Sequence, residues 1–308
     1  MRESTQRSRW RRPLMIVALA VIGWWALLYL LQDFLVFPGA YLGGGATDAD
    51  PPADVELASI EPEPSVRVEA WLLQPMSGRT SDPISQSNEN LDVSQRSQPR
   101  GRCVLVYLHG NGELIDHQLG FARELQRRGA WVFLPEYRGY GLSTGRPSRA
   151  AIRADMLRWT RWLAARPELD GLPLVIHGRS LGGGVAADLA ADLAAQGRPP
   201  AGLILESTMA AVAPMAWRYG APPLLVRHAY APVDVVRSAT WPVLILHSAN
   251  DEVMGGGAGP ELRDAAPPGI ATYHAFAGRH NEAGLGDVAA YWAAVDAFLD
   301  RVVPVPVR

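Results

Sequence analysis

Three residues of this chain have the types that nucleophilic catalysis requires, and each follows an apolar run. Ser180 lies in the Gly-x-Ser-x-Gly pattern of residues 178–182, directly after the run 174–176. Asp251 and His280 each follow a later run of the same kind. A serine hydroxyl is a weak nucleophile at neutral pH, so it needs a histidine base and an acid that orients the imidazole. We therefore predict that Ser180, His280 and Asp251 act as nucleophile, base and acid.

The glycines that flank the serine have a steric purpose. Ser180 would stand on a strained turn between a strand and a helix, where side chains two residues away would collide with neighbouring backbone. Gly178 and Gly182 leave that space open, so the hydroxyl can be exposed. A five-residue pattern also matches ordinary turns by chance, and its placement between a strand and a helix is what favours a nucleophile.

A second glycine-rich segment, residues 109–112, reads His-Gly-Asn-Gly and follows another apolar run. Its glycines let the backbone turn and present an N–H group toward an oxyanion. We predict that the backbone N–H groups of Asn111 and Leu181 bind the oxyanion. The supporting residues of this loop would be His109, Gly110 and Gly112. Taken alone, the segment could equally be an ordinary glycine-rich turn.

Other residues compete for the base and acid positions. The chain has seven histidines, and His280 is preferred because it follows the last predicted strand, where the base is needed. His109 is expected to belong structurally to its turn and His177 to end a strand, and the remaining four have no partner pattern. Glu252 and Asp264 are rival acids, but Asp264 falls within a helical pattern. Glu252 is therefore the main alternative to the preferred acid.

Composition argues against several other kinds of chemistry. The chain has 308 residues, of which 48% are hydrophobic, and a net charge of −2, so it is globular and lacks the charge of a nucleic-acid binder. No Cys/His cluster has metal-ligand spacing, and the absence of Lys excludes a Lys-containing phosphate loop. The single Cys103 is expected to be a small buried hydrophobe. We predict no metal, no cofactor and no obligate protein partner.

The amino terminus has the pattern of a membrane anchor. Residues 14–31 form 18 uncharged, apolar positions, long enough to cross a bilayer as a helix, with Trp24, Trp25 and Tyr29 where an aromatic belt would lie. Five arginines precede this stretch, and the next one after it is Arg67. The positive-inside rule therefore puts the amino terminus in the cytoplasm and the remaining chain outside it, which is the periplasm if the source is a bacterium. A cleaved signal peptide is the alternative, but no small-x-small site follows the stretch.

The rest of the chain alternates between apolar runs and helical patterns from residue 103 onward, which predicts an α/β fold with a mostly parallel sheet covered by helices. Runs 55–60 and 66–73 are expected to pair antiparallel at the sheet edge. The predicted regions are a basic cytoplasmic tail (1–12), a transmembrane anchor (13–36), a tether (37–53) and a catalytic domain (54–303). Inside the domain we expect a flexible excursion (77–101) and a short cap-like connection (206–240).

Four segments together resemble the α/β-hydrolase superfamily: residues 109–112, 136–143, 178–182 and 280–282. The order serine, aspartate, histidine is also that of its triad. The chain looks most like the membrane-anchored branch of lysophospholipase-like and acyl-thioesterase-like serine hydrolases, which Phe37-Pro38 after the apolar stretch also fits. This resemblance implies the α/β-hydrolase fold from about residue 34 to 302 and a supporting role for residues 137–141.

The resemblance and the anchor imply a membrane-tethered enzyme that cleaves lipid or other acyl esters or thioesters through an acyl-enzyme on Ser180. A serine aminopeptidase of the same fold is one alternative. It would need a carboxylate for the substrate's free amine, and Glu206 at a strand end could serve, although we expect it to cap a helix. A non-catalytic, membrane-anchored interaction protein is the other alternative, but it would gain nothing from a strained serine. A dehalogenase would carry Asp in place of Ser180.

Overall fold

The computed structural model describes residues 3–41, 51–76, 101–282 and 286–303, and side chains from residue 11 onward. The helices are α1 (Glu3–Val36), α2 (Leu119–Arg127), α3 (Arg149–Ala164), α4 (Leu181–Ala195), α5 (Val212–Trp217), α6 (Pro232–Arg237), α7 (Ala258–Ala265) and α8 (Val288–Val302). Short 3-10 helices are η1 (Pro38–Ala40), η4 (Asp116–Gln118), η5 (Pro167–Leu169), η6 (Pro223–Leu225) and η7 (His280–Glu282). The strands are β1 (Val55–Glu63), β2 (Val66–Leu73), β3 (Cys103–Leu108), β4 (Ala130–Pro135), β5 (Leu174–Arg179), β6 (Gly202–Glu206), β7 (Val243–Ser248) and β8 (Ala271–Phe276).

The described strands form one sheet in the order β1-β2-β4-β3-β5-β6-β7-β8. The pairs β1–β2 and β2–β4 are antiparallel, and every later neighbour is parallel. This confirms the mostly parallel sheet, and β1 and β2 form the expected antiparallel pair at its edge. The predicted excursion at 77–101 lies outside the described residues except for its last position.

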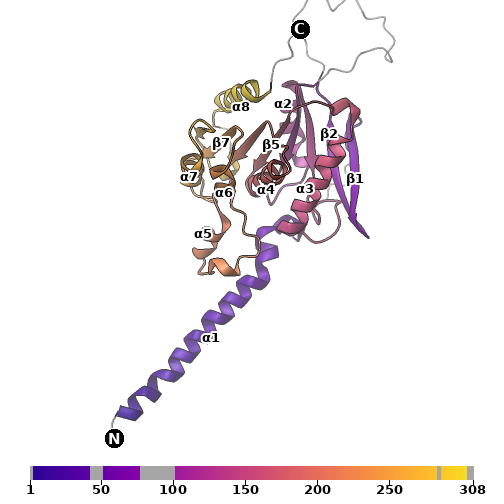
Figure 1. Cartoon of the computed structure of the whole chain (residues 1–308). Helices are drawn as coiled ribbons and strands as arrows, with labels where there is room; N and C mark the ends of the chain where they lie inside the picture. The colour runs from indigo at the N-terminus through magenta and orange to yellow at the C-terminus, as the bar shows by residue number, and fades with distance from the viewer. Residues whose placement is uncertain (1–2, 42–50, 77–100, 283–285, 304–308) are drawn as a thin grey trace, which may run out of the picture.

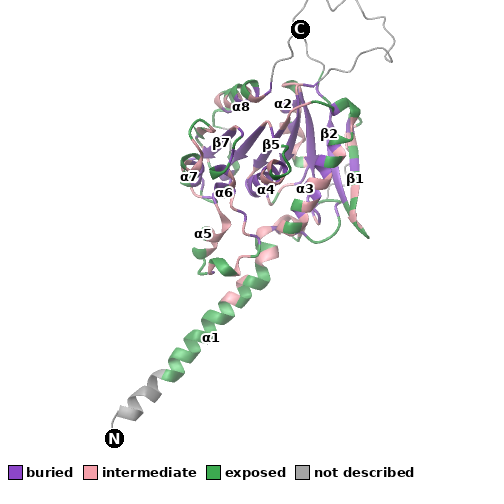
Figure 2. Cartoon of the chain, viewed as in Figure 1, coloured by how far each residue is buried: buried purple, intermediate pink, exposed green. Residues whose placement is uncertain are grey.

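Helices cover both faces of the sheet, which explains the unbroken apolar runs of the central strands (Figures 1 and 2). In β3, alternate residues pack in two separate hydrophobic clusters, with Val104 and Val106 in one and Leu105 and Tyr107 in the other. Helices α3, α4, α6 and α7 contribute to the first cluster, and α2 and α8 contribute to the second. A strand buried on both faces needs apolar side chains at every position.

Helix α1 projects away from the domain, and its surface is largely exposed (Figures 1 and 2). Among the described residues, its segment Arg11–Val36 is the one helix long and apolar enough to cross a membrane. The expected tether at 37–53 does not begin as a free linker. Phe37 is fully buried beside the His228 ring, and the Gly39 N–H donates to the Asn111 carbonyl at 3.1 Å. The end of α1 is therefore attached directly to the loop after β3.

Candidate active site

The turn at Ser180 has the strained backbone expected between β5 and α4. Ser180 has φ 53° and ψ −119°, and this positive φ is one that residues other than glycine rarely adopt. A Cβ atom on Gly178 would lie 2.2 Å from the Gly182 carbonyl oxygen, and one on Gly182 would lie 2.0 Å from the Leu108 carbonyl oxygen. Both glycines are therefore required sterically, because α4 approaches β5 at Gly178 and the end of β3 at Gly182 too closely for any side chain.

The structure brings the three predicted side chains together in one chain of hydrogen bonds. Ser180 Oγ lies 3.0 Å from His280 Nε2, and His280 Nδ1 lies 2.8 Å from Asp251 Oδ2. Because an ionised carboxylate can only accept, Nδ1 carries the ring proton and Nε2 is left to accept from the serine hydroxyl. All three residues are buried, which keeps these contacts away from competing water.

The Asp251 carboxylate is stabilised in its ionised form. Burial, the largest influence, opposes ionisation, but the hydrogen bond from His280, the N–H of Met254 and electrostatic attraction to the rings of His280 and His247 outweigh it and lower the pKa of Asp251. Its Oδ1 accepts from the backbone N–H groups of Val253 at 2.9 Å and Met254 at 2.7 Å. A carboxylate held this way keeps the His280 ring in one orientation.

The rival acids take other positions. Glu252 Oε2 accepts the backbone N–H of His280 at 3.1 Å, so Glu252 contacts the backbone of His280 rather than its imidazole ring. Asp264 lies on α7 and pairs with Arg263 at 2.7 Å. Of the three carboxylates considered from the sequence, Asp251 is the one whose oxygen contacts the imidazole.

The predicted oxyanion loop lies against the serine. A Cβ atom on Gly110 would be 3.5 Å from Ser180 Cβ, so the loop passes directly beside the nucleophile. The Gly110 N–H donates to Glu113 Oε2 at 2.7 Å, which leaves Asn111 as the next donor along the loop. Leu181 opens α4, so its N–H has no acceptor within the helix. Gly112 has open space around its Cα and no positive φ, and the structure gives no steric reason for glycine there.

Glu136 is a buried carboxylate that supports this loop, and we did not predict this role for it. Its two oxygens contact His109 Nε2 at 2.7 Å and accept the backbone N–H of Ile115 at 3.1 Å. The Tyr137 hydroxyl donates to the His109 carbonyl at 2.8 Å. His109 is thus a structural part of the turn, as expected, and Tyr137 supports it. Glu136 opens the segment 136–143 that the sequence had already singled out, which was the available signal.

Arg179, which immediately precedes Ser180, links the loops around the site. Its guanidinium contacts Glu113 of the loop after β3 and lies 3.6 Å from Glu206 at the end of β6. It also donates to the His280 carbonyl at 3.3 Å and to Asn281 Oδ1 at 3.3 Å. Two carboxylates therefore neutralise Arg179. Its side chain connects the predicted oxyanion loop with the loop that carries His280.

Glu206 is buried and does not cap a helix, which corrects our expectation. Its Oε2 contacts His177 Nε2 at 2.8 Å and accepts the Tyr291 hydroxyl at 2.7 Å. Burial raises the pKa of Glu206, but the hydrogen bond and charge of His177, with help from Arg179 and Tyr291, more than reverse this effect and lower it overall. The adjacent parallel pairing of β5 and β6 places Arg179 opposite Glu206 and so creates the contact.

We expect Glu206→Gln to lower the free energy of unfolding by about 3 kcal/mol at neutral pH, because it removes the buried carboxylate that the His177 ring, the Tyr291 hydroxyl and the Arg179 guanidinium all face. A carboxyl with a lowered folded-state pKa contributes stability that is present above its ordinary value of 4.5 and is lost as the pH falls through the folded-state value. The difference in free energy of unfolding between wild type and variant should therefore become smaller in acid. Urea unfolding of the full chain in detergent, from neutral pH to below pH 4.5, measures this difference.

Glu168→Gln is the matched control, because Glu168 pairs with Arg166 at the surface. An exposed pair of this kind contributes less than about 1 kcal/mol. A Glu206→Gln deficit that is constant from neutral to acid pH would contradict the role assigned to the buried carboxylate.

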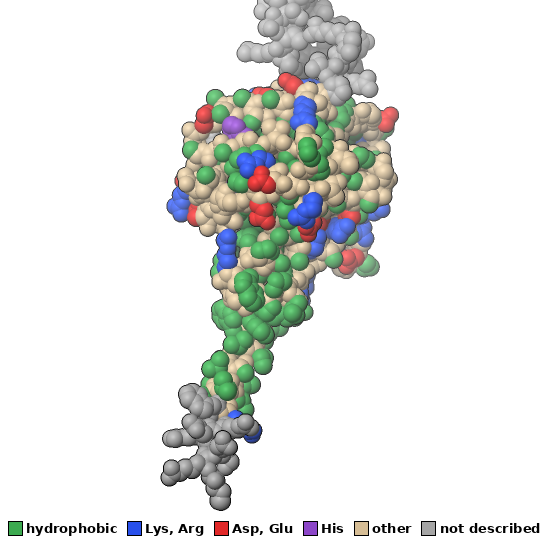
Figure 3. All heavy atoms as spheres, turned by 60° about the vertical axis from the view of Figure 1, so that its left-hand side comes forward, with side chains coloured by type: hydrophobic (Ala, Val, Ile, Leu, Met, Phe, Trp, Pro, Cys, Tyr) green, Lys and Arg blue, Asp and Glu red, His purple; other side chains and the backbone are tan. Residues whose placement is uncertain are grey.

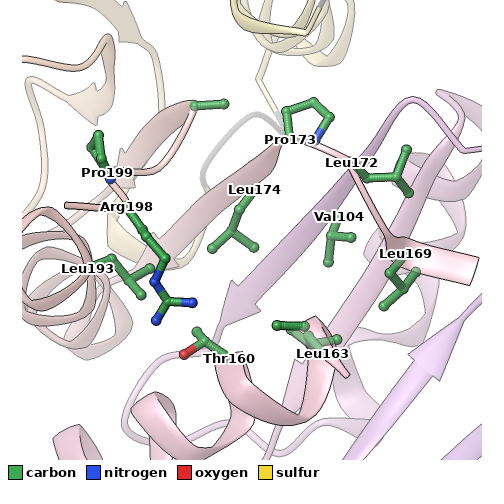
Figure 4. A pocket seen from close by; sticks show the side chains of 12 residues that line it. Val104, Thr160, Leu163, Leu169, Leu172, Pro173, Leu174, Leu193, Arg198 and Pro199 are labelled. Atoms are coloured by element: carbon green, nitrogen blue, oxygen red, sulfur yellow. The ribbon is translucent and has the colours of Figure 1, made fainter. Parts of the chain in front are cut away.

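A cavity of about 390 Å³ lies away from these residues, at the amino ends of β3 and β5 (Figure 4). Figure 4 shows Val104 and Leu174 on its strand side, with Thr160, Leu163 and Arg198 facing them. Ser180 follows the carboxyl end of β5, so this cavity lies at the opposite ends of the strands. Within the described residues, no group of three His, Cys, Asp or Glu side chains is arranged to hold a metal ion. Cys103 is buried, as expected.

Comparison with known proteins associates this chain with hydrolases. A family model described as serine aminopeptidase, S33, matches residues 97–232. Lysophosphatidylserine lipase ABHD12 from Danio rerio is 31% identical over 229 residues, which cover 67% of this chain but only 57% of that protein. Protein bem46 from Schizosaccharomyces pombe is 29% identical over 280 residues, covering 88% of this chain and 87% of that protein.

Solved structures show the same fold. The crystal structure of the alpha/beta hydrolase GrgF from Penicillium sp. sh18 matches with a TM-score of 0.61 at 14% identity. The match covers 82% of this chain and 99% of that chain, so it includes almost the whole of the GrgF chain. At this level of identity the likeness is one of fold, and it confirms the architecture that the sequence predicted.

Proposed function

We infer the function of this chain from its family, since it belongs to the α/β-hydrolase superfamily and is similar to lysophospholipase-like members of it. We propose that it is a membrane-anchored serine hydrolase that cleaves carboxylic esters or thioesters. The observation that carries the proposal is the hydrogen-bonded series Ser180–His280–Asp251 on a strained turn. A strained serine persists only where the surrounding structure enforces it, and a binding module has no use for one.

The proposed reaction proceeds through an acyl-enzyme. Ser180 Oγ attacks the acyl carbonyl carbon while His280 Nε2 takes the hydroxyl proton, and the same proton is then delivered to the leaving alcohol or thiol. Asp251 stabilises the imidazolium that forms. The N–H groups of Asn111 and Leu181 bind the oxyanion, and each such donor contributes about 3 kcal/mol in comparable sites. Water repeats the sequence on the acyl-enzyme and releases the acid.

The substrate class follows from the membrane position of the site. We propose that α1 spans the bilayer with its amino terminus in the cytoplasm, because its segment Arg11–Val36 is long and apolar enough to do so. The site lies at the edge of the sheet from which α1 projects (Figure 1). Lysophospholipids and other single-chain acyl esters are therefore the proposed substrates, in line with the activity named for the ABHD12 relative.

The peptidase alternative is weaker. An aminopeptidase must present a free carboxylate to the amine of its substrate, and Glu206 was the candidate for this role. Glu206 is only 3% exposed, and its oxygens face His177, Tyr291 and Arg179. These partners already compensate the charge, so the name of the matched family model does not by itself favour a peptidase here.

A substrate panel tests the proposal. The full chain in detergent is assayed on lysophospholipids with different head groups, monoacylglycerol, acyl-thioesters and aminoacyl-anilides, with Ser180→Ala as the blank. We expect release of fatty acid from the single-chain lipids and no cleavage of the anilides. Turnover of the anilides alone would replace the esterase proposal by the peptidase alternative.

A further inference from the structure

Residues 212–226, which we call the cap segment, expose large apolar side chains next to α1. Trp217, Tyr219 and Leu224 are 62%, 69% and 85% exposed, and Arg218 is the one charged residue of the segment. Figure 3 shows hydrophobic side chains extending from the helix onto the adjoining base of the domain. A contiguous exposed apolar surface on a folded chain marks an interaction site.

Hydrogen bonds fix the cap segment to α1. Three of its carbonyl oxygens accept side-chain donors of the helix: Tyr219 from Trp24 Nε1 (2.9 Å), Gly220 from Trp25 Nε1 (2.8 Å) and Leu225 from Gln32 Nε2 (2.6 Å). The backbone N–H of Arg227, just past the segment, donates to Gln32 Oε1 at 2.7 Å. The loop therefore has a defined position along the helix.

Most backbone N–H groups of the cap segment are paired, as contact with lipid requires. Irregular backbone tolerates hydrocarbon only where its polar groups are paired. The N–H groups of residues 218–221, 225 and 226 donate to carbonyls within the segment, and Pro222 and Pro223 have no N–H. The carbonyl oxygens of residues 219 and 220 accept the indole N–H groups of Trp24 and Trp25.

The contacts with α1 also set the depth of the loop. Trp24 and Trp25 belong to the uncharged stretch 14–31, and Trp25 precedes Asp33 by about 12 Å along the helix. Half of the hydrocarbon core measures about 15 Å. A loop bonded to these indoles must then share their leaflet if α1 crosses the bilayer.

Charged groups gather on the domain side of the segment. Asp33 Oδ1 accepts from Arg227 Nη2 at 2.9 Å and lies 2.8 Å from His228 Nε2, which places an ion-paired cluster where the head groups would begin. The Arg218 guanidinium reaches back toward Gly255, since a Cβ atom there would lie 3.5 Å from its Nη2. A long arginine side chain can keep its charge near water in this way while its stem contacts lipid.

We propose that the cap segment is a second membrane contact, in which residues 217–224 insert into the leaflet beside α1 and bind the bilayer itself. The inference rests on the proposed anchor function of α1. A cavity of about 190 Å³ lies beside the segment and is lined by Met215 of the cap segment and Met254 of the loop after β7. The Met254 N–H donates to Asp251, so one lining residue of this cavity contacts the proposed acid.

The test measures the lipid exposure of single cysteines labelled with the fluorophore NBD. Leu224→Cys reports on the cap segment, Leu19→Cys on the middle of α1, and Leu57→Cys on β1 is the matched exposed control away from both. The native Cys103 is buried and its pKa is raised to about 12, so it stays unlabelled at neutral pH. The full chain is placed in phosphatidylcholine nanodiscs that contain lipid with a doxyl quencher on the acyl chain.

We expect the Leu224 and Leu19 labels to emit at shorter wavelength, to be quenched by the doxyl lipid and to be shielded from aqueous iodide. The Leu57 label should show the reverse. If Leu224 behaves like Leu57 while Leu19 is in lipid, the cap proposal is overturned and the anchor stands. If Leu19 is also reached by iodide and not by the doxyl group, the anchor fails and this inference fails with it. Labelling of each variant by a fluorophosphonate confirms that it is folded.

Discussion

Ser180→Ala should reduce kcat on the best ester of the panel by about 10⁵-fold or more, because removal of an activated serine leaves only binding and oxyanion stabilisation. Substrate affinity should change little, since the Oγ atom makes its bond to the substrate only during the reaction. Steady-state kinetics on purified wild type and variant measure both effects. Covalent labelling of wild type by a fluorophosphonate, absent in the variant, assigns the loss to this hydroxyl.

Ser207→Ala is the matched control. Ser207 is also buried, follows the neighbouring strand β6 and has a positive φ of 44°, but its Oγ has no hydrogen-bond partner among the described residues. This variant should keep both turnover and labelling. Activity that survives in Ser180→Ala would refute the acyl-enzyme mechanism. A folded wild type that neither labels nor turns over esters would instead favour the interaction-protein alternative.

The parallel core of the fold was predictable because burial on both faces leaves a strong signal in sequence. The runs at 104–108 and 243–246 became β3 and β7 with each end within two residues of the prediction. The connection 206–240 was different. Its helices α5 and α6 span six residues each, fewer than two turns, and so repeat too little to produce a recognisable period.

The meeting of Ser180, Asp251 and His280 was predictable for a related reason. Parallel strands end at one edge of the sheet, so polar residues just after Arg179, Ser248 and Phe276 had to meet there. The contacts that join these loops were not predictable. The pairing of Arg179 with Glu206 depends on β5 lying next to β6, which only the sheet order reveals.

The attachment of α1 to the cap segment shows the same limit over a longer range. Trp24 and Tyr219 are 195 residues apart, and an aromatic belt explains the two tryptophans equally well without any partner. The sequence therefore supported an anchor followed by a tether. In the structure, buried Phe37 directly follows α1, Gln32 of the helix donates to the cap segment, and Gly39 donates to the loop after β3.

Asp251→Asn should reduce kcat by about 10⁴-fold with little change in KM. The amide is close to the carboxylate in size, but it carries no charge to stabilise the imidazolium, and it can donate to Nδ1 and so favour the wrong tautomer. The lowered pKa of Asp251 keeps the wild-type carboxylate ionised across the neutral range, so the defect of the variant should persist throughout that range. Kinetics over that range, with fluorophosphonate labelling rates, measure the loss.

Glu252→Gln separates the two neighbouring carboxylates. Glu252 contacts the backbone N–H of His280, and a glutamine oxygen can accept the same hydrogen bond. We therefore expect a loss of less than about tenfold, the effect of one weakened hydrogen bond at the edge of the site. The reverse order, a large loss in Glu252→Gln and a small one in Asp251→Asn, would transfer the acid role to Glu252. The imidazole would then have to rotate in the working enzyme, because in this structure its Nδ1 faces Asp251 at 2.8 Å.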